Sequence, residues 1–267
     1  MAGETTIDES RALQALLDYY RACGVDCALD ETARDRFADS ARPLPKAPVE
    51  ENPAPPQPRS GKPPVALFPE ETARIAESVA AAARTLDELR ESLSAFEGFG
   101  SVANARHFLF SRGAPAEVMA MDYAPGEAEE RGGIAFSGAE ARLLEAMLGA
   151  IGTARNDSYC AYFSPWRPPG GRAFAPHVAS VLAPFARRHI ELARPKAVLL
   201  LGDAARHVLG SSETPTRLYA RPFELRLGEQ TIVAVPAPGL SAMLRTSALK
   251  PRAWSALRTI GARLAES

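Results

Sequence analysis

Carboxylate side chains gather in a loop that follows a short apolar segment near the middle of the chain. Asp122 ends the apolar run 118–122, and Glu129 and Glu130 follow in the same loop. A carboxylate beside a bound substrate orients or deprotonates water, which is the chemistry of a hydrolase. Acidic residues are also favoured in the first turn of a helix by its dipole, without any catalytic role. Asp122 and Glu129 are therefore candidate catalytic residues, and both interpretations of the acidic loop are open.

A second loop, rich in proline and glycine, carries two arginines, Arg167 and Arg172. Guanidinium groups bind phosphate oxygens through paired hydrogen bonds, so both are candidate phosphate contacts. Surface salt bridges are the alternative use of such arginines. Residues 1–99 carry a net charge of −7 and residues 100–267 one of +6. A basic C-terminal portion is compatible with nucleic acid as a partner.

Short apolar segments that alternate with amphipathic helices predict where these loops lie. The segments read as strands at 118–122, 158–163, 197–202 and 231–237. Strands separated by helices pair in parallel through right-handed crossovers. We therefore predict an α/β fold, a three-layer α/β/α sandwich with a mainly parallel central sheet of about four strands. Ligands of such folds bind at the carboxyl ends of the strands, so a site is expected there.

The N-terminal part of the chain differs in composition from the rest. Ten of the 23 prolines lie between Pro43 and Pro69, in a segment with few large apolar side chains. Such a segment cannot repay its ordering entropy, and it predicts a linker over 41–70. Residues 1–40 predict a short helical segment that docks on the main domain or on a protein partner, and residues 71–267 the main domain.

Composition excludes several other classes of protein. No apolar run is long enough for a membrane span, and the acidic N-terminus lacks the order of a signal peptide, so we expect a cytoplasmic protein. Three cysteines, Cys23, Cys27 and Cys160, form neither a disulfide framework nor a convincing zinc site. We therefore expect reduced thiols and no bound metal.

The acidic loop resembles the first motif of family 4 uracil-DNA glycosylases, the iron-sulfur type. Residues 122–131 read D-Y-A-P-G-E-A-E-E-R and are followed by Gly133, Phe136 and Gly138. The family motif reads G-E-A-P-G-x-x-E-D-x-x-G-x-P-F-x-G. The shared turn and the shared spacing of the later residues carry the resemblance.

Further matches follow in the same order along the chain. Residues 159–172, Y-C-A-Y-F-S-P-W-R-P-P-G-G-R, are similar to the family's V-Y-I-T-N-x-x-K-C-R-P-P-x-N-R. L-G-D-A-A over 201–205 resembles L-G-x-x-A, and M-L-R at 243–245 with K-P-R-A-W at 250–254 resembles the closing L-L-R and K-x-x-A-W. Together these motifs cover most of the chain after Leu86.

The resemblance implies a DNA glycosylase site in which most polar groups have changed. In the family, a carboxylate of the first motif helps to place water, an aromatic stacks on the base, an asparagine reads uracil, and a histidine faces the departing base. This sequence keeps the aromatic as Phe136, but it has Tyr123, Tyr162 and Gly239 at the other three positions. The implied base pocket consists of Tyr123, Ala124, Pro125, Gly126, Phe136 and Tyr162.

The resemblance also implies a DNA-binding loop around Gly239. Only its backbone N–H is available to the departing base, and loss of one such donor typically costs 10²-fold to 10³-fold in rate. Leu240 is a candidate apolar wedge for a DNA groove, and Ser241 and Arg245 are candidate phosphate contacts. An ordinary exposed loop is the alternative.

The cysteines that hold the family's iron-sulfur cluster are replaced in this sequence. The corresponding positions hold Phe96, Phe99, Trp166 and Leu182. Such a cluster requires thiolate ligands, so we predict that the chain has none. The large apolar substitutes are expected to fill the space with packed side chains.

The resemblance favours a divergent uracil-DNA glycosylase superfamily protein that acts on a flipped or single-stranded base of DNA in base-excision repair, with weak or altered hydrolysis of the N-glycosidic bond. A non-catalytic nucleic-acid-binding module or a repair-complex scaffold are the alternatives. Hydrolysis predicts that Asp122 or Glu129 points into the pocket, whereas a scaffold predicts a pocket filled by Tyr123 or Tyr162.

Overall fold

The computed structural model describes residue 14 and residues 69–99, 105–154 and 157–265. Apart from residue 14, these belong to one compact unit, Pro63–Ser267. The predicted helical segment 1–40 therefore lies almost wholly outside the described residues, and so does the predicted linker except for its last two residues. Those two, Pro69 and Glu70, begin the first helix of the domain.

A six-stranded sheet in the order β1-β3-β2-β4-β6-β5 forms the centre of the domain. Its four inner strands run parallel and match the predicted ones: β2 (Val118–Asp122), β3 (Ser158–Tyr162), β4 (Ala197–Leu201) and β6 (Gln230–Ala237). Two antiparallel edge strands, β1 (Ser111–Arg112) and β5 (Phe223–Leu227), extend the sheet beyond the predicted four. β5 forms a hairpin with β6 through a turn at Gly228, whose φ of 58° suits glycine.

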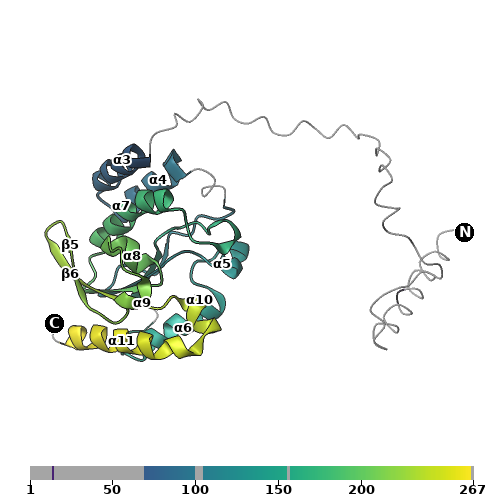
Figure 1. The fold of residues 1–267 in the computed structure, drawn as a ribbon, viewed down its shortest axis with the longest axis vertical. Helices are drawn as coiled ribbons and strands as arrows, with labels where there is room; N and C mark the ends of the chain where they lie inside the picture. Colours follow the sequence, from purple (N-terminus) through teal and green to yellow (C-terminus); the bar gives the residue numbers. More distant parts are fainter. Residues whose placement is uncertain (1–13, 15–68, 100–104, 155–156, 266–267) are drawn as a thin grey trace, which may run out of the picture. The chain divides into compact units, whose positions relative to one another are not determined.

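Helices cover both faces of the sheet, as Figure 1 shows. One face carries α3 (Pro69–Ala82), α4 (Leu86–Ala95), α7 (Pro176–Ala193) and α8 (Ala204–Leu209). The other carries α6 (Gly138–Gly149), α10 (Leu240–Arg245) and α11 (Lys250–Ala265). Short helices α5 (Glu127–Gly132) and α9 (Pro215–Leu218) lie in the connections. The predicted three-layer α/β/α architecture is confirmed.

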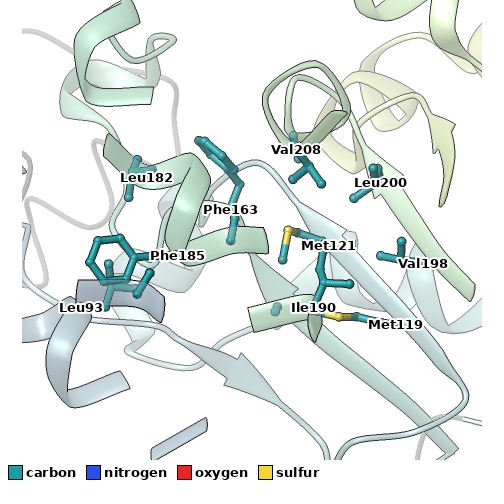
Figure 2. Packing of buried hydrophobic residues seen from close by; sticks show 14 of the residues in the cluster. Leu93, Met119, Met121, Phe163, Leu182, Phe185, Ile190, Val198, Leu200 and Val208 are labelled. Atoms are coloured by element: carbon teal, nitrogen blue, oxygen red, sulfur yellow. The ribbon is translucent and has the colours of Figure 1, made fainter. Parts of the chain in front are cut away.

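Strand side chains alternate between the two cores. Met119 and Met121 of β2 pack with α7, while Val118 and Ala120 face the helices of the opposite layer. Figure 2 shows the first of these cores, where both methionines lie near Ile190 of α7. Each of the strands β2, β3 and β4 has five residues, and all of them are buried, as expected of strands covered on both faces.

Two helices differ from what hydrophobic spacing alone indicates. The spacing over 75–96 suits one continuous helix, but the structure has two, because the Thr85 hydroxyl accepts the Glu88 N–H at 3.1 Å and caps a new helix. In α11, hydrophobic spacing places Trp254 on the same face as Leu257 and Ile260, but Trp254 is 47% exposed. The buried face consists of Ala253, Ala256, Leu257 and Ile260. No helix in the described part of the chain is long and apolar enough to cross a membrane.

Candidate functional site

The carboxyl ends of the parallel strands surround a cavity of about 780 Å³. The loops after β2, β3, β4 and β6 supply its walls, which is where ligands bind in folds of this type. Eleven of the predicted site residues line it: Asp122, Tyr123, Ala124, Pro125, Gly126, Arg167, Arg172, Gly239, Leu240, Ser241 and Arg245. Glu129, Phe136 and Tyr162 are not among its lining residues.

Asp122 is the buried carboxylate of the cavity wall. It ends the central strand β2, is 7% exposed, and accepts the Tyr123 N–H at 2.8 Å. The pKa of Asp122 is raised from 3.8 to about 7, chiefly by burial. The nearby carboxylates of Glu140 and Glu129 contribute to this rise, and N–H groups of Tyr123 and Leu240 oppose it. The carboxyl group therefore exchanges protons near neutral pH, as a general base or acid requires.

Glu129 belongs to a separate cluster that we call the closed triad: Glu129, Phe136 and Tyr162. The Tyr162 hydroxyl donates to Glu129 Oε1 at 2.6 Å and accepts the Phe136 N–H at 2.9 Å. The Tyr162 ring stacks on the Phe136 ring with centroids 4.2 Å apart and planes 5° from parallel. All three side chains are buried, so the Phe136 face that Tyr162 covers is not available to a ligand in this structure.

The carboxylate of Glu129 also holds two backbone groups. Its Oε2 accepts the Gly126 N–H at 2.7 Å, and its Oε1 accepts the Ser137 N–H at 3.1 Å. The first of these bonds caps α5, a role that acidic residues at a helix start commonly take. Glu129 thus joins the start of α5, the start of α6 and the end of β3.

Tyr123 lines the cavity without plugging it. Its hydroxyl accepts the Phe174 N–H at 3.0 Å, and its ring stacks on Phe163 with centroids 5.8 Å apart. Burial raises the pKa of Tyr123, so the phenol stays protonated at neutral pH. The side chain therefore offers a fixed aromatic wall.

The arginines of the site lie toward its outer part. Arg172 and Arg245 are exposed, and Arg167 is half-buried. The guanidinium group of Arg167 lies close to Gly171 of the same loop: a Cβ atom added to Gly171 would be 3.3 Å from its Nη2. Arg245 Nη1 donates to the Ser241 hydroxyl within the same turn of α10. These side chains give the cavity a basic rim.

The loop after β6 departs from one expectation. Leu240 is 1% exposed and belongs to the same buried cluster as Met243 and Leu257, so it does not project from the surface as a groove-inserting wedge must. Gly239 lies beside it with extended backbone, φ −63°. A Cβ added at Gly239 would meet Gly202 Cα at 3.5 Å and Asp122 Oδ1 at 3.8 Å.

Four polar residues of the cavity were not predicted from the sequence: Glu127, Glu140, Asp203 and Tyr219 all line it. Burial raises the pKa of Glu140, and Glu129 adds to the effect. Asp203 follows β4, at the strand end where a site was expected, so its position was a usable signal. Nothing in the sequence around Glu140 or Tyr219 distinguishes them from ordinary surface residues.

The four positions that resemble the cluster ligands lie together in the α7 core. The Phe99 ring packs at a tilt against Trp166, with centroids 4.9 Å apart, and against Phe96, at 5.2 Å. Leu182 is fully buried in the same cluster. None of these side chains ligates iron, and Cys160, the cysteine in the described part of the chain, lies on β3 in the opposite core. These residues do not fit an iron-sulfur cluster. No group of three potential metal ligands occurs among the described residues.

Comparison with protein families agrees with this architecture. The family model of the uracil DNA glycosylase superfamily matches residues 110–258, more than half of the chain, from just before β1 to within α11. The chain therefore belongs to the uracil DNA glycosylase superfamily.

Three curated relatives point to one branch of that superfamily. The type-4 uracil-DNA glycosylase of Archaeoglobus fulgidus is 29% identical over 153 residues, which are 55% of this chain and 76% of that protein. The type-4 enzyme of Sulfurisphaera tokodaii is 27% identical over 45% of this chain and 58% of its own length. That of Thermotoga maritima is 29% identical over 40% and 57%. The chain thus resembles type-4 enzymes. Its matches cover less than two thirds of the length of the Sulfurisphaera tokodaii and Thermotoga maritima proteins.

Proposed function

We propose that this chain is a divergent base-excision repair glycosylase that binds DNA over the cavity and hydrolyses an N-glycosidic bond there. The single observation that carries the proposal is Asp122: a buried carboxylate in the cavity wall, with a pKa near 7, at the end of the central strand. A glycosylase needs a group that orients water toward the sugar, and a carboxylate of this kind suits the task.

The rim supports the choice of DNA as the partner. Arg167, Arg172 and Arg245 surround an interior that holds carboxylates, so phosphates bind at the edge while a nucleobase enters. A flipped or single-stranded base fits this entry, since a stacked base in a duplex cannot reach a buried carboxylate. In this proposal Glu129 holds the loops of the site in place and does not touch the reacting atoms.

The test is base release from single-stranded and double-stranded oligonucleotides that contain uracil, hypoxanthine or xanthine. We expect release whose rate rises with pH through about 7, because Asp122 acts as a base only when deprotonated. Asp122→Asn should reduce the rate by about 100-fold or more. Glu224→Gln, an exposed change on the edge strand β5, is the matched control and should leave the rate unchanged.

A second candidate function rests on the closed triad. Because the Tyr162 ring already stacks on Phe136, no base can stack on that face, which favours a non-catalytic DNA-binding module or scaffold. The same oligonucleotides decide between the two. Binding without release from any of them supports the module, and release that depends on Asp122 excludes it.

The proposal includes no iron-sulfur cluster, because side chains without ligating atoms fill the corresponding space. We expect that protein reconstituted with iron and sulfide under reducing conditions shows no visible cluster absorption and no bound iron. A stoichiometric cluster after reconstitution would contradict this prediction. A type-4 relative treated in parallel controls for the reconstitution itself.

A further inference from the structure

The interior of the cavity is rich in hydrogen-bond acceptors. Four carboxylate residues line it: Asp122, Glu127, Glu140 and Asp203. Among the described residues that line the cavity there is no asparagine, glutamine or histidine. A neutral base such as uracil offers one ring N–H that a carboxylate can accept, and two carbonyl oxygens that ionised carboxylates repel.

The positively charged donors of the cavity, Arg167, Arg172 and Arg245, lie toward its rim. The Leu240 N–H, which belongs to the loop beside Gly239, bonds to the Asp122 carboxylate. Arg245 is exposed and donates to Ser241, and Arg172 is exposed as well. Apart from the three rim arginines, the lining residues supply only neutral donors, such as the Gly239 N–H, to negative charge that develops on a departing base.

The charge of the base decides whether such a donor is needed. A neutral base takes the electron pair of the glycosidic bond and leaves as an anion, so its departure needs a donor or a proton. A base that already carries a positive charge, such as a purine alkylated at a ring nitrogen, takes the same pair and leaves neutral. Carboxylates around such a base attract its positive charge, and no negative charge that they would repel develops on the base as the bond breaks.

We propose that the cavity takes cationic N-alkylated purines, such as 7-methylguanine or 3-methyladenine, in preference to uracil. The proposal rests on the proposed function and names its substrate class. Tyr123 and Tyr219 line the same cavity, and the face of a tyrosine ring attracts cations. The cavity volume of about 780 Å³ lies within the range of small-molecule sites and accommodates a purine nucleotide.

The reaction balances with the groups present. A water oxygen forms a bond to C1′ of the deoxyribose as the bond from C1′ to the purine ring nitrogen breaks. The bonding electron pair goes to the ring nitrogen, which neutralises the purine, and the proton of the water goes to the Asp122 carboxylate. Water, sugar and base are the only reactants, so no oxidant, reductant or further donor is required.

The test compares methylated DNA with uracil-containing DNA on the whole protein. Duplex DNA treated with a methylating agent is incubated with the protein, and released 3-methyladenine and 7-methylguanine are quantified by mass spectrometry against uracil released from a matched duplex. Incubation without protein corrects for spontaneous depurination. We expect methylpurine release at least about 10-fold faster than uracil release, reduced about 100-fold by Asp122→Asn.

Further variants separate charge from folding. Glu140→Gln removes a second carboxylate of the wall, and it should slow methylpurine release by about 10-fold without changing the thermal midpoint much, since Glu140 is only half-buried. Glu224→Gln on β5 should leave release unchanged. A change in binding to unmodified DNA is not expected for either variant, because phosphates bind at the rim.

The outcomes separate this inference from the proposed function. Uracil released as fast as methylpurines, or faster, overturns the cationic substrate class and leaves the glycosylase proposal standing. Methylpurine release that Asp122→Asn does not slow overturns the role of the carboxylate. No release of any base, with DNA binding intact, overturns both proposals.

Discussion

The closed triad and the Asp122 wall of the cavity are built from neighbouring parts of the same motif, yet they differ in what their carboxylates have left to do. Both carboxylate oxygens of Glu129 accept hydrogen bonds, from the Tyr162 hydroxyl and from two backbone N–H groups. The Asp122 carboxylate accepts hydrogen bonds from the N–H groups of Tyr123 and Leu240, and Asp122 lines the cavity. The difference teaches that an acidic residue in a family motif gains or loses chemistry through its hydrogen-bond partners, which its position in the motif does not reveal.

The largest expected effect comes from breaking the closed triad at Glu129. Glu129→Ala leaves two partly buried N–H groups and the buried Tyr162 hydroxyl without an acceptor, and should reduce the free energy of unfolding by about 4 kcal/mol. Chemical denaturation at pH 7 measures the change. Tyr162→Phe, which removes a single hydroxyl, is the matched smaller change and should cost about 1 kcal/mol.

A loss below about 1 kcal/mol for Glu129→Ala would mean that the triad does not hold the loops together. A second readout is hydrogen exchange of the Gly126 and Ser137 amides, which should become fast in this variant. Tyr162→Phe keeps the stacking on Phe136 and should leave the Gly126 amide protected.

A smaller effect of opposite sign is expected at Asp122. Its pKa is raised from 3.8 to about 7, so the folded chain holds a proton that the unfolded chain has released, and Asp122 costs stability as pH rises from about 4 to 7. The full shift corresponds to at most about 4 kcal/mol, and we expect Asp122→Asn to be more stable than the parent by about 2 kcal/mol at pH 8.

The pH dependence of that gain is the sharper test. The difference between Asp122→Asn and the parent should be small near pH 4 and reach its full size above pH 7, because asparagine does not titrate. Thermal unfolding over this pH range measures it, with Glu224→Gln as the surface control. A gain independent of pH would show that the Asp122 carboxylate ionises normally and would remove the observation on which the proposed function depends.

The sheet was predictable because hydrophobic pattern dictates it. The runs 118–122, 158–163, 197–202 and 231–237 are apolar enough to be covered on both faces, and the structure places them in parallel at the centre. Strand β1 escaped prediction because two residues carry no periodicity. Strand β5 carried a signal, since its alternating F-E-L-R-L precedes a Gly-Glu turn.

The site was less predictable than the sheet. The loops after the strands were correctly located, since chain order and parallel pairing fix them. Which loop carboxylate is buried, and against what, depends on tertiary contacts such as the bond from Tyr162 on β3 to Glu129 on α5. Glu140 reaches the cavity from α6, and no motif marks it.

Gly239 has a consequence for protein engineering. Its φ of −63° is open to any residue, and an added Cβ would meet its neighbours at 3.5 Å or more, which is ordinary contact. The backbone therefore does not require glycine at a position that faces the wall of the cavity beside Asp122. Residue 239 is a place where designed side chains, including hydrogen-bond donors of graded strength, can be installed while the sheet stays as it is.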